Sequence, residues 1–553
     1  MKTQIQPIGP MIDGFVLNTP ADQIPDSAMS GGKNIFIEDG MVKKKYGYTQ
    51  LGLDLPLNGA VIGSDQFSMF DGQSYLIVIT TNEVYLWNSS TSTWTRGLPP
   101  ATSTGYGIGL YGAGYYSGLS RSAYGGGFYG LGLYGEGAPL DSSLGTSLGV
   151  ISSDMASYDT FRQITEDDVW WLFTNGVDEI KKYTGGSYFS DLGGSPPKAK
   201  HLIEFKGHLL LLDTVEGGLR NPQRIRWSDT GNCEEWNDGN ANYADLTGAD
   251  WIQGAVRIKG SYLAILKERS VWLGYATGDD YVFQFDLKTQ GVGCAAANTI
   301  DVINDSVIFL GWDDVYLFDG VSTVPISQSI RTELFQTLNP AEIGRAFGVT
   351  VEEQKEYWLF VPTTGTYPDT AWVYNYEINK WTKHTYPHNI TSFGFYQSDN
   401  TLSFDDLVGT FDGLTGRFDN KAYLATAPTV LLGDENGYVY QYDSMATEED
   451  GDIIDGYFDT KDFNFTNMTQ QQRITGIDVS YIGNGLEVYY STDKGKSWVY
   501  TTTLLPSTTY KRQQVNIRTS EDWIRFRFRD KSEGGQFSFS RANLYWQVGG
   551  RLL

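Results

Sequence analysis

The chain has 553 residues, of which 14% are aromatic and 19% are charged, and 64 of them are glycine. This composition is typical of a folded, β-rich protein and excludes a disordered chain. The formal net charge of −25 disfavours a surface made to bind nucleic acid, because such binding uses clustered lysine and arginine to release counterions from phosphates.

The first residues, MKTQIQPIGPMIDG, lack the apolar core of a secretory signal, and no run approaches the roughly 18 apolar residues of a membrane-spanning helix. We therefore expect a soluble protein that is made in a cytoplasm and has no membrane span. Cys233 and Cys294 are too few for a disulfide scaffold or a thiolate zinc site.

Between residues 56 and 445 the sequence repeats one pattern at intervals of roughly 35 to 55 residues. Each unit has an apolar run, a turn rich in Gly, Asp or Asn, and a second strand that ends in an aromatic residue. The units lie at 74–94, 168–186, 207–227, 261–275, 305–320, 355–381 and 428–443. Small sheets that cannot bury their apolar faces alone are typical of propeller blades, so we predict an all-β fold with a β-propeller of about seven blades.

Strands such as VIFLG, at 307–311, are apolar on both faces, which favours sheets stacked on both sides. The alternative for this region is a set of β-sandwiches, in which apolar and polar residues would alternate more cleanly.

Residues 105–137 contain thirteen glycines and eight tyrosine or phenylalanine residues. Three hexamers there, GIGLYG, GGGFYG and GLGLYG, fit the dinucleotide-binding pattern, but no amphipathic helix follows them, so glycine frequency explains the pattern. We expect a loop insertion at about 99–155, between the first and second units. Its aromatic residues are candidates to reach a lumen or a partner, since tyrosine gives contact area at low entropic cost. They are Tyr106, Tyr111, Tyr124, Phe128, Tyr129 and Tyr134.

One amphipathic helix is expected among the strands, in ISQSIRTELFQTLNP at 326–340. Ser329 can cap its start and Pro340 marks its end. Its apolar stripe consists of Ile330, Leu334, Phe335 and Leu338.

Two further patterns in this half favour loops. Phe-Asp recurs at Phe404, Phe411 and Phe418, but the glycines between exclude a coiled coil and indicate serial turns. His384 and His388 have the spacing of a helical metal pair, but Pro387 and the strand-like run before them indicate loop residues. We predict no metal and no cofactor.

The last hundred residues alternate cleanly between apolar and polar, so we predict a β-sandwich at 446–553. Within 473–498, Asn484 and Gly485 predict the type I′ turn of a hairpin. In EDWIRFRFRDK, at 521–531, the apolar residues Ile524, Phe526 and Phe528 occupy one strand face, and Arg525, Arg527 and Arg529 occupy the other.

Two sets of basic residues have two interpretations each. Arg525, Arg527 and Arg529 are either a solvated strand face or a contact with an acidic neighbouring subunit, because arginine forms bidentate pairs with carboxylates. The same alternatives apply to Lys43, Lys44 and Lys45.

Ser491, Asp493, Gly495 and Trp498 spell the Asp-box pattern of sialidase propellers, where the box is a folding element remote from catalysis. A glycosidase also needs two suitably spaced carboxyl groups or a tyrosine nucleophile with arginines, and 66 acidic residues leave room for a pair. The chain has no P-loop, no H-E-x-x-H and no G-x-S-x-G. We predict a protein that is not an enzyme, without catalytic residues.

Several stretches together resemble one family. They are DGFVLNTPADQIPDSAMSGGKNIFIEDGMVKKKYGY (13–48), RIRWSDTGNCEEWN (224–237), LKERSVWLGY (266–275), GVGCAAANTI (291–300), DSVIFLGWDDVYLFDG (305–320) and ISQSIR (326–331). They are similar to the tail nozzle proteins, also called tail stabilisation or tail tubular B-type proteins, of short-tailed bacteriophages. The resemblance covers nearly the whole chain.

The resemblance implies a structural virion protein with a propeller and a platform built from both chain ends, here an N-terminal arm at 1–55 and the region 446–553. Such subunits form a six-fold ring below the portal and adaptor proteins, in the virion tail, and are assembled in the host cytoplasm. Fibres or spikes attach outside, and genome DNA leaves through the channel. An acidic wall suits this passage because it repels phosphates.

Two other functions stay open. A glycan-binding or glycan-degrading tail protein would fit the Asp-box, and a cellular propeller scaffold that binds peptides would fit the repeats.

Overall fold

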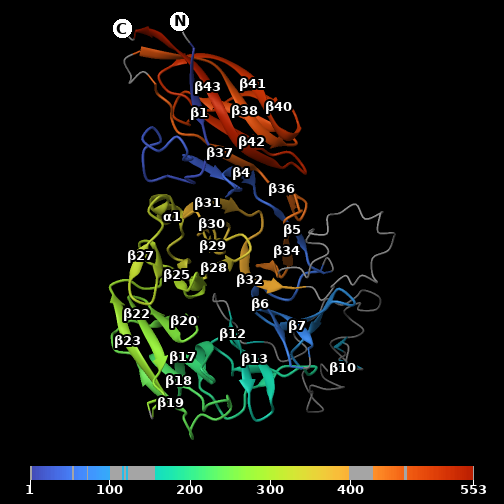
Figure 1. The fold of residues 1–553 in the computed structure, drawn as a ribbon. Helices are drawn as coiled ribbons and strands as arrows, with labels where there is room; N and C mark the ends of the chain where they lie inside the picture. Colours follow the sequence, from blue (N-terminus) through green and yellow to red (C-terminus); the bar gives the residue numbers. More distant parts are fainter. Residues whose placement is uncertain are drawn as a thin grey trace, which may run out of the picture.

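The computed structural model describes residues 3–52, 55–70, 72–99, 115–116, 120–121, 148, 156–279, 281–397, 428–465 and 470–551. Within these ranges the chain consists of many small antiparallel sheets with a single α-helix (Figure 1). The prediction of an all-β class is confirmed.

Six sheets of the described chain are built alike, each from four consecutive strands that pair in chain order. The first three are β6 (Val61–Ser68), β7 (Ser74–Thr80), β8 (Val84–Asn88) and β9 (Thr93–Arg96); β12 (Ser157–Gln163), β13 (Asp168–Thr174), β14 (Lys181–Tyr183) and β15 (Ser190–Asp191); β16 (Lys198–Phe205), β17 (His208–Glu216), β18 (Leu219–Trp227) and β19 (Asn242–Asp245). The next three are β20 (Ile252–Ile258), β21 (Tyr262–Lys267), β22 (Ser270–Ala276) and β23 (Phe283–Gln290); β24 (Asp301–Ile303), β25 (Ser306–Leu310), β26 (Val315–Phe318) and β27 (Thr323–Pro325); β28 (Phe347–Val351), β29 (Glu356–Val361), β30 (Thr370–Asn375) and β31 (Lys380–Thr385). The two-residue strands β10 (Tyr115–Tyr116) and β11 (Ser120–Arg121) pair with each other, and in the sequence they lie between the first and second sheets.

The seventh sheet joins distant parts of the chain. Its strands are β32 (Ile390–Tyr396), β33 (Thr429–Asp434), β34 (Val439–Asp443), β5 (Gly47–Gln50), β35 (Glu448–Glu449) and β36 (Asp452–Ile453). The fourth strand, β5, comes from the N-terminal part of the chain and pairs antiparallel with β34, with Tyr48 opposite Tyr442. A sheet made mainly of residues 390–453 is therefore completed by residues 47–50.

The seven sheets have a propeller-like arrangement. In Figure 1 the strands β6, β12, β20, β28 and β32 surround a common centre, and the later strands of each sheet lie further out. Apolar clusters fill the spaces between successive sheets, and one cluster joins the first sheet to the seventh through Val61, Val78, Leu431 and Val439.

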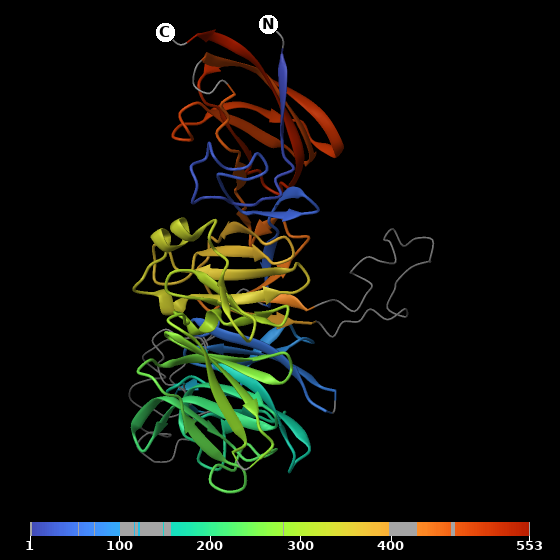
Figure 2. The same ribbon diagram turned by 60° about the vertical axis from the view of Figure 1, so that its left-hand side comes forward.

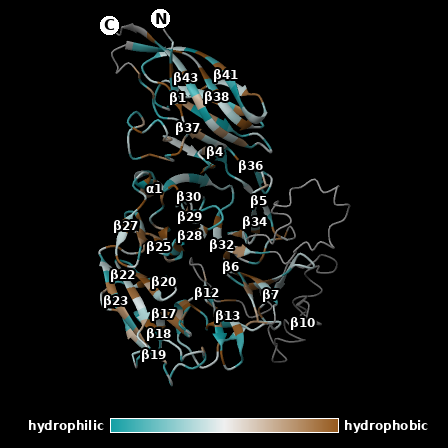
Figure 3. Cartoon of the chain, viewed as in Figure 1, coloured by the Kyte–Doolittle hydropathy of each residue, from teal (hydrophilic) through white to brown (hydrophobic). Residues whose placement is uncertain are grey.

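Several strands in this region are buried on both faces, as predicted for runs such as VIFLG. All six residues of β29 are buried, as are the first seven of β17. Figure 3 shows hydrophobic residues running along strands such as β7, β17 and β22. A sheet that is covered on both sides needs this composition, because each side chain leaves water whichever way it points.

Two further sheets stack face to face at the rim of this arrangement (Figure 2). The first terminal sheet contains β1 (Gln4–Ile8), β3 (Ile35–Glu38), β4 (Met41–Lys44), β43 (Phe537–Arg551), β38 (Gln470–Gly483) and β41 (Ser507–Glu521). The second terminal sheet contains β2 (Gly31–Lys33), β37 (Gly456–Asp459), β42 (Arg525–Asp530), β39 (Leu486–Ser491) and β40 (Val499–Leu504). Phe458 and Phe528 of one sheet contact Phe539 of the other in the core between them.

The N-terminal segment covers β31, the outer strand of the sixth sheet. The Phe15 amide donates to the Trp381 carbonyl, and the Thr385 amide donates to the side chain of Asn34. This segment also supplies β1 to β4, so it connects the propeller-like part to the terminal sheets (Figure 2).

Two expectations about loops and turns were wrong. His384 lies in β31 rather than in a loop, fully buried, and burial lowers its pKa to about 3. Asn484 and Gly485 do not close a hairpin, because the flanking strands β38 and β39 belong to different sheets. Asn484 instead donates from its backbone amide to the Gln536 carbonyl, which anchors the crossover.

The helix α1 (Arg331–Thr337) is shorter than predicted and has a different cap. Ile330 occupies the N-cap position, and its side chain makes no capping hydrogen bond. The Thr332 amide donates to the side chain of Asn18, which comes from the N-terminal segment. Ser329 uses its backbone carbonyl to accept from Leu17, so tertiary contact replaces the local cap.

Two sets of predicted residues lie outside the described residues: the Phe-Asp repeat, and the aromatic residues Tyr106, Tyr111, Tyr124, Phe128, Tyr129 and Tyr134. Within the described ranges, the helices fall short of the length and hydrophobicity needed to cross a bilayer.

Candidate interaction surfaces

The arginines of β42 pair with carboxylates of the same chain. The guanidinium of Arg525 makes two hydrogen bonds to Asp462, at 2.8 and 2.7 Å. Arg527 binds Asp459 and Arg529 binds Asp455 in the same bidentate way. We call these three pairs the Arg–Asp ladder. As predicted, the intervening Ile524, Phe526 and Phe528 are buried, because alternate residues of a strand face opposite sides.

The middle pair of the ladder is the most enclosed by aromatic rings. The Arg527 guanidinium lies 4.0 Å from the ring centre of Tyr457 and 4.1 Å from that of Trp498. Stacking on two rings fixes a planar guanidinium and adds cation–π attraction.

Trp498 belongs to the Asp-box, which forms the turn between β39 and β40. The Ser491 hydroxyl donates to Asp493, and the Ser497 amide and hydroxyl donate to the same carboxylate. These hydrogen bonds hold the pKa of Asp493 well below its usual range. The box therefore ties a hairpin down, and its tryptophan packs against the ladder.

The ladder should contribute measurably to stability. We expect Arg527→Met to lower the free energy of unfolding by about 3 kcal/mol, because it leaves the nearly buried Asp459 carboxylate without a counter-ion. The matched control is Arg162→Met, which removes an exposed pair with Asp167 and should cost less than about 1 kcal/mol. Chemical denaturation of both variants would measure this, and equal losses would contradict the assignment.

The three lysines differ from the expected surface row. Lys44 is fully buried, and its ammonium lies 3.5 Å from Asp530. Lys45 is also buried, 2.6 Å from Glu449. The prediction of a subunit contact is wrong for these two, because neither ammonium reaches the surface. Lys43 is partly exposed and pairs with Glu38. A subunit contact through the ladder arginines stays a prediction.

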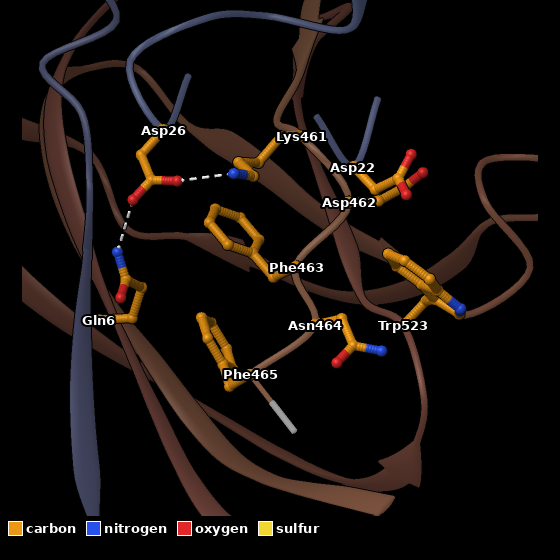
Figure 4. A pocket seen from close by; sticks show the side chains of 9 residues that line it. All are labelled: Gln6, Asp22, Asp26, Lys461, Asp462, Phe463, Asn464, Phe465 and Trp523. Atoms are coloured by element: carbon orange, nitrogen blue, oxygen red, sulfur yellow. Dashed lines mark hydrogen bonds and ion pairs between the residues drawn. The ribbon is translucent and has the colours of Figure 1, made fainter. Parts of the chain in front are cut away.

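A cavity of about 390 Å³ lies beside the ladder, where β1 and the N-terminal loop meet the segment that follows β37 and the residue Trp523 before β42 (Figure 4). Lys461 binds Asp26, which also accepts from Gln6, and the rings of Phe463, Phe465 and Trp523 line the space. Gln6, Asp26 and Lys461 thus bind one another across the joint between the chain ends.

Sequence reasoning missed a second arginine surface. The outward face of the first terminal sheet carries Arg473, Arg512, Arg518 and Arg541, all exposed. We call it the arginine face. The alternation in RITGIDVS and QQVNIRTS could have placed Arg473 and Arg518 outward, but not side by side, because strand order was not predictable.

An acidic cavity of about 480 Å³ lies between β3, the sixth sheet and the seventh sheet. Its carboxyl groups belong to Glu38, Asp39, Glu353, Glu356 and Glu377, and Lys355 is the basic residue in its lining. Glu356 is buried and accepts a hydrogen bond from Trp358 Nε1 at 2.8 Å. Burial raises the pKa of Glu356 to about 7.

This pKa predicts a pH-dependent stability. The folded chain holds a proton on Glu356 at pH values where the unfolded chain has lost it. The contribution of this group to stability is therefore fully present below about pH 4.5 and is lost as the pH rises through about 7. We expect Glu356→Gln, which can still accept from Trp358, to be more stable than the parent by roughly 3 kcal/mol at pH 8 and about equal at pH 4.5. Melting temperatures at both pH values would test this; an equal difference at both would contradict it.

No group of three or more His, Cys, Asp or Glu side chains with metal-binding geometry occurs among the residues that the structure describes. His388 lies 3.8 Å from Asp452, and His384 contacts the Ile35 carbonyl.

No protein-family model and no curated protein matches the chain. Among solved structures, YCF48 bound to D1 peptide is 9% identical with a TM-score of 0.33, over 71% of this chain and 97% of that one. PorZ, a surface component of the type-IX secretion system of Porphyromonas gingivalis, is 8% identical with a TM-score of 0.32, over 78% of this chain and 44% of that one. An exo-β-1,3-galactanase from Phanerochaete chrysosporium is 8% identical with a TM-score of 0.25, over 65% of this chain and 97% of that one. Similarities this weak carry no argument about function.

Proposed function

We propose that the chain is a tail nozzle subunit of a short-tailed bacteriophage, a structural protein that forms a six-fold ring and is not an enzyme. The observation that carries the proposal is the joint use of both chain ends: residues 4–44 and 456–551 together form the two terminal sheets, and residues 47–50 complete the seventh sheet. This is the architecture that the resemblance to nozzle proteins implies.

In this proposal the seven sheets close into a propeller. Contacts between the inner strands of neighbouring sheets support closure. The Asp159 carboxylate accepts from the Glu204 amide, joining the second and third sheets. Gln66 of the first sheet exchanges two hydrogen bonds with the backbone of Gln397, just after β32 of the seventh. Such contacts supply hydrogen-bond partners to backbone groups at the edges of the sheets. A closed ring of sheets needs contacts of this kind at each junction between neighbouring sheets.

A central cavity of about 180 Å³ also supports closure of the seven sheets into a propeller. Its lining comes from the inner strands of four sheets and from η2 (Ala297–Thr299), which precedes the fifth sheet. The lining includes Tyr158, Leu202, Ala255, Asn298 and Phe393. Residues so distant in sequence meet at one place when their sheets surround a common axis.

The role follows from charge and architecture together. A chain with a net charge of −25 makes an acidic wall, along which DNA can slide without the many contacts that lysine and arginine would create. We propose portal and adaptor proteins as neighbours on one side of the ring, fibres or spikes outside it, and a location in the virion tail.

Electron microscopy and enzymology of the purified full-length protein distinguish this proposal from a glycan-degrading tail protein. We expect six-fold rings, alone or with portal and adaptor proteins, and no turnover of host polysaccharide. A trimer that depolymerises polysaccharide on its own would contradict the proposal.

A further inference from the structure

The arginine face is a basic surface on an otherwise acidic chain. Arg541 of β43 and Arg512 of β41 both lie opposite Ser480 of β38, the strand between them. Arg473 lies opposite Ser520 and Gln547 towards the other end of the same strands. Since neighbouring strands are about 5 Å apart, these side chains share one continuous face.

Most of these arginines have no counter-ion. Arg512 pairs with Asp478, whose carboxylate also accepts from the Tyr545 hydroxyl. For Arg473, Arg518 and Arg541, the described part of the chain supplies no ion pair and no side-chain hydrogen bond. The ladder arginines, by contrast, are all occupied. The arginine face therefore offers three free guanidinium groups to a partner.

The same chain carries a matching surface. The acidic cavity presents the exposed carboxylates of Asp39, Glu353 and Glu377 around the buried Glu356. Phe36, Tyr46 and Tyr442 add aromatic walls, against which a guanidinium can stack. A hollow of about 480 Å³ that is acidic and aromatic has the chemistry to accept arginine side chains.

We propose that the arginine face of one copy of this chain docks on the acidic cavity of a second copy, in a repeated head-to-tail contact. Two different faces meet in such a contact, so a bound pair leaves one arginine face and one acidic cavity free, and a suitable rotation closes the series into a ring. A second copy is the partner that fits because one chain carries both complementary surfaces. The inference rests on the proposed function, which requires self-association, and specifies its contact.

The test uses two charge-reversal variants of the full chain. One carries Arg473→Glu, Arg518→Glu and Arg541→Glu, and the other carries Glu353→Arg and Glu377→Arg. Matched controls are Arg269→Glu and Glu166→Arg, which change exposed charges in turns outside both surfaces. Mass photometry and electron microscopy measure the oligomers at low salt, where charge contacts are least screened.

We expect each variant alone to lose the ring and to self-associate at least about tenfold more weakly, because like charges then meet. An equimolar mixture of the two variants should form mixed dimers or larger mixed oligomers, since the native cavity of one meets the native arginine face of the other, and the two reversed faces also carry opposite charges. This pairing also shows that both variants are folded. The controls should form rings like the parent.

Other outcomes separate the two proposals. Normal rings from both variants would overturn this contact and leave the nozzle proposal standing. Monomeric variants that also fail to pair when mixed would overturn the pairing of these faces. Mixed dimers or larger mixed oligomers, together with open filaments of the parent, would support the contact and contradict the closed ring. A parent that never self-associates would overturn both.

Discussion

Replacing Lys45 with methionine is expected to lower the free energy of unfolding by about 3 to 5 kcal/mol, because it leaves a buried carboxylate unpaired. The Lys45 ammonium lies 2.6 Å from Glu449, donates to the Thr385 carbonyl and sits 3.8 Å from the centre of the Tyr386 ring. It therefore links the N-terminal segment to both the sixth and the seventh sheets. Chemical denaturation at pH 8 would measure the loss.

Two controls test whether the unpaired Glu449 carboxylate causes the loss of stability. The double variant Lys45→Met with Glu449→Leu removes both charges and should recover most of the stability. Burial already raises the pKa of Glu449, and removal of Lys45 raises it further, so the single variant should lose less stability at pH 4.5, where that carboxyl is protonated in the folded variant and about half protonated in the unfolded chain. Equal losses at both pH values, or no recovery in the double variant, would contradict the account.

Tyr48→Ala is expected to destabilise the protein by about 3 to 5 kcal/mol, because it empties a large buried site in β5, the fourth strand of the seventh sheet. The Tyr48 ring is 1% exposed and contacts the rings of Tyr440 and Tyr386. Hydrogen exchange should show the amides of β5 and β34 opening first. The measurement is denaturation combined with exchange read out by mass spectrometry.

Tyr48→Phe is the matched control. The Tyr48 hydroxyl is buried and has no hydrogen-bond partner among the described residues, so its removal should leave stability unchanged or raise it. If Tyr48→Phe is as unstable as Tyr48→Ala, the packing of the ring at position 48 does not account for the stability that β5 provides.

The sequence was sufficient where local patterns decide the structure. Apolar runs such as those of β17 and β29 predicted strands buried on both faces, because the pattern of a single strand reports how many of its faces are covered. Alternation in β42 likewise placed Phe526 inside and Arg527 outside.

Long-range pairing could not be predicted in this way. The strand β5, GYTQ, contains no apolar run, and its partner β34 lies almost 400 residues later. The consecutive lysines 44 and 45 look like a solvated row, yet distant acids at 530 and 449 neutralise them inside the protein. Asn484 and Gly485 favour a turn, but strand order decides whether that turn closes a hairpin or crosses between sheets.

Electron cryomicroscopy of the purified full-length protein tests the central claim most directly. We predict rings of six subunits in which each subunit shows seven blades around its own axis, with no gap between the first and seventh, and a platform formed by the two chain ends. Isolated trimers, or a subunit whose first and seventh sheets stand apart, would contradict it.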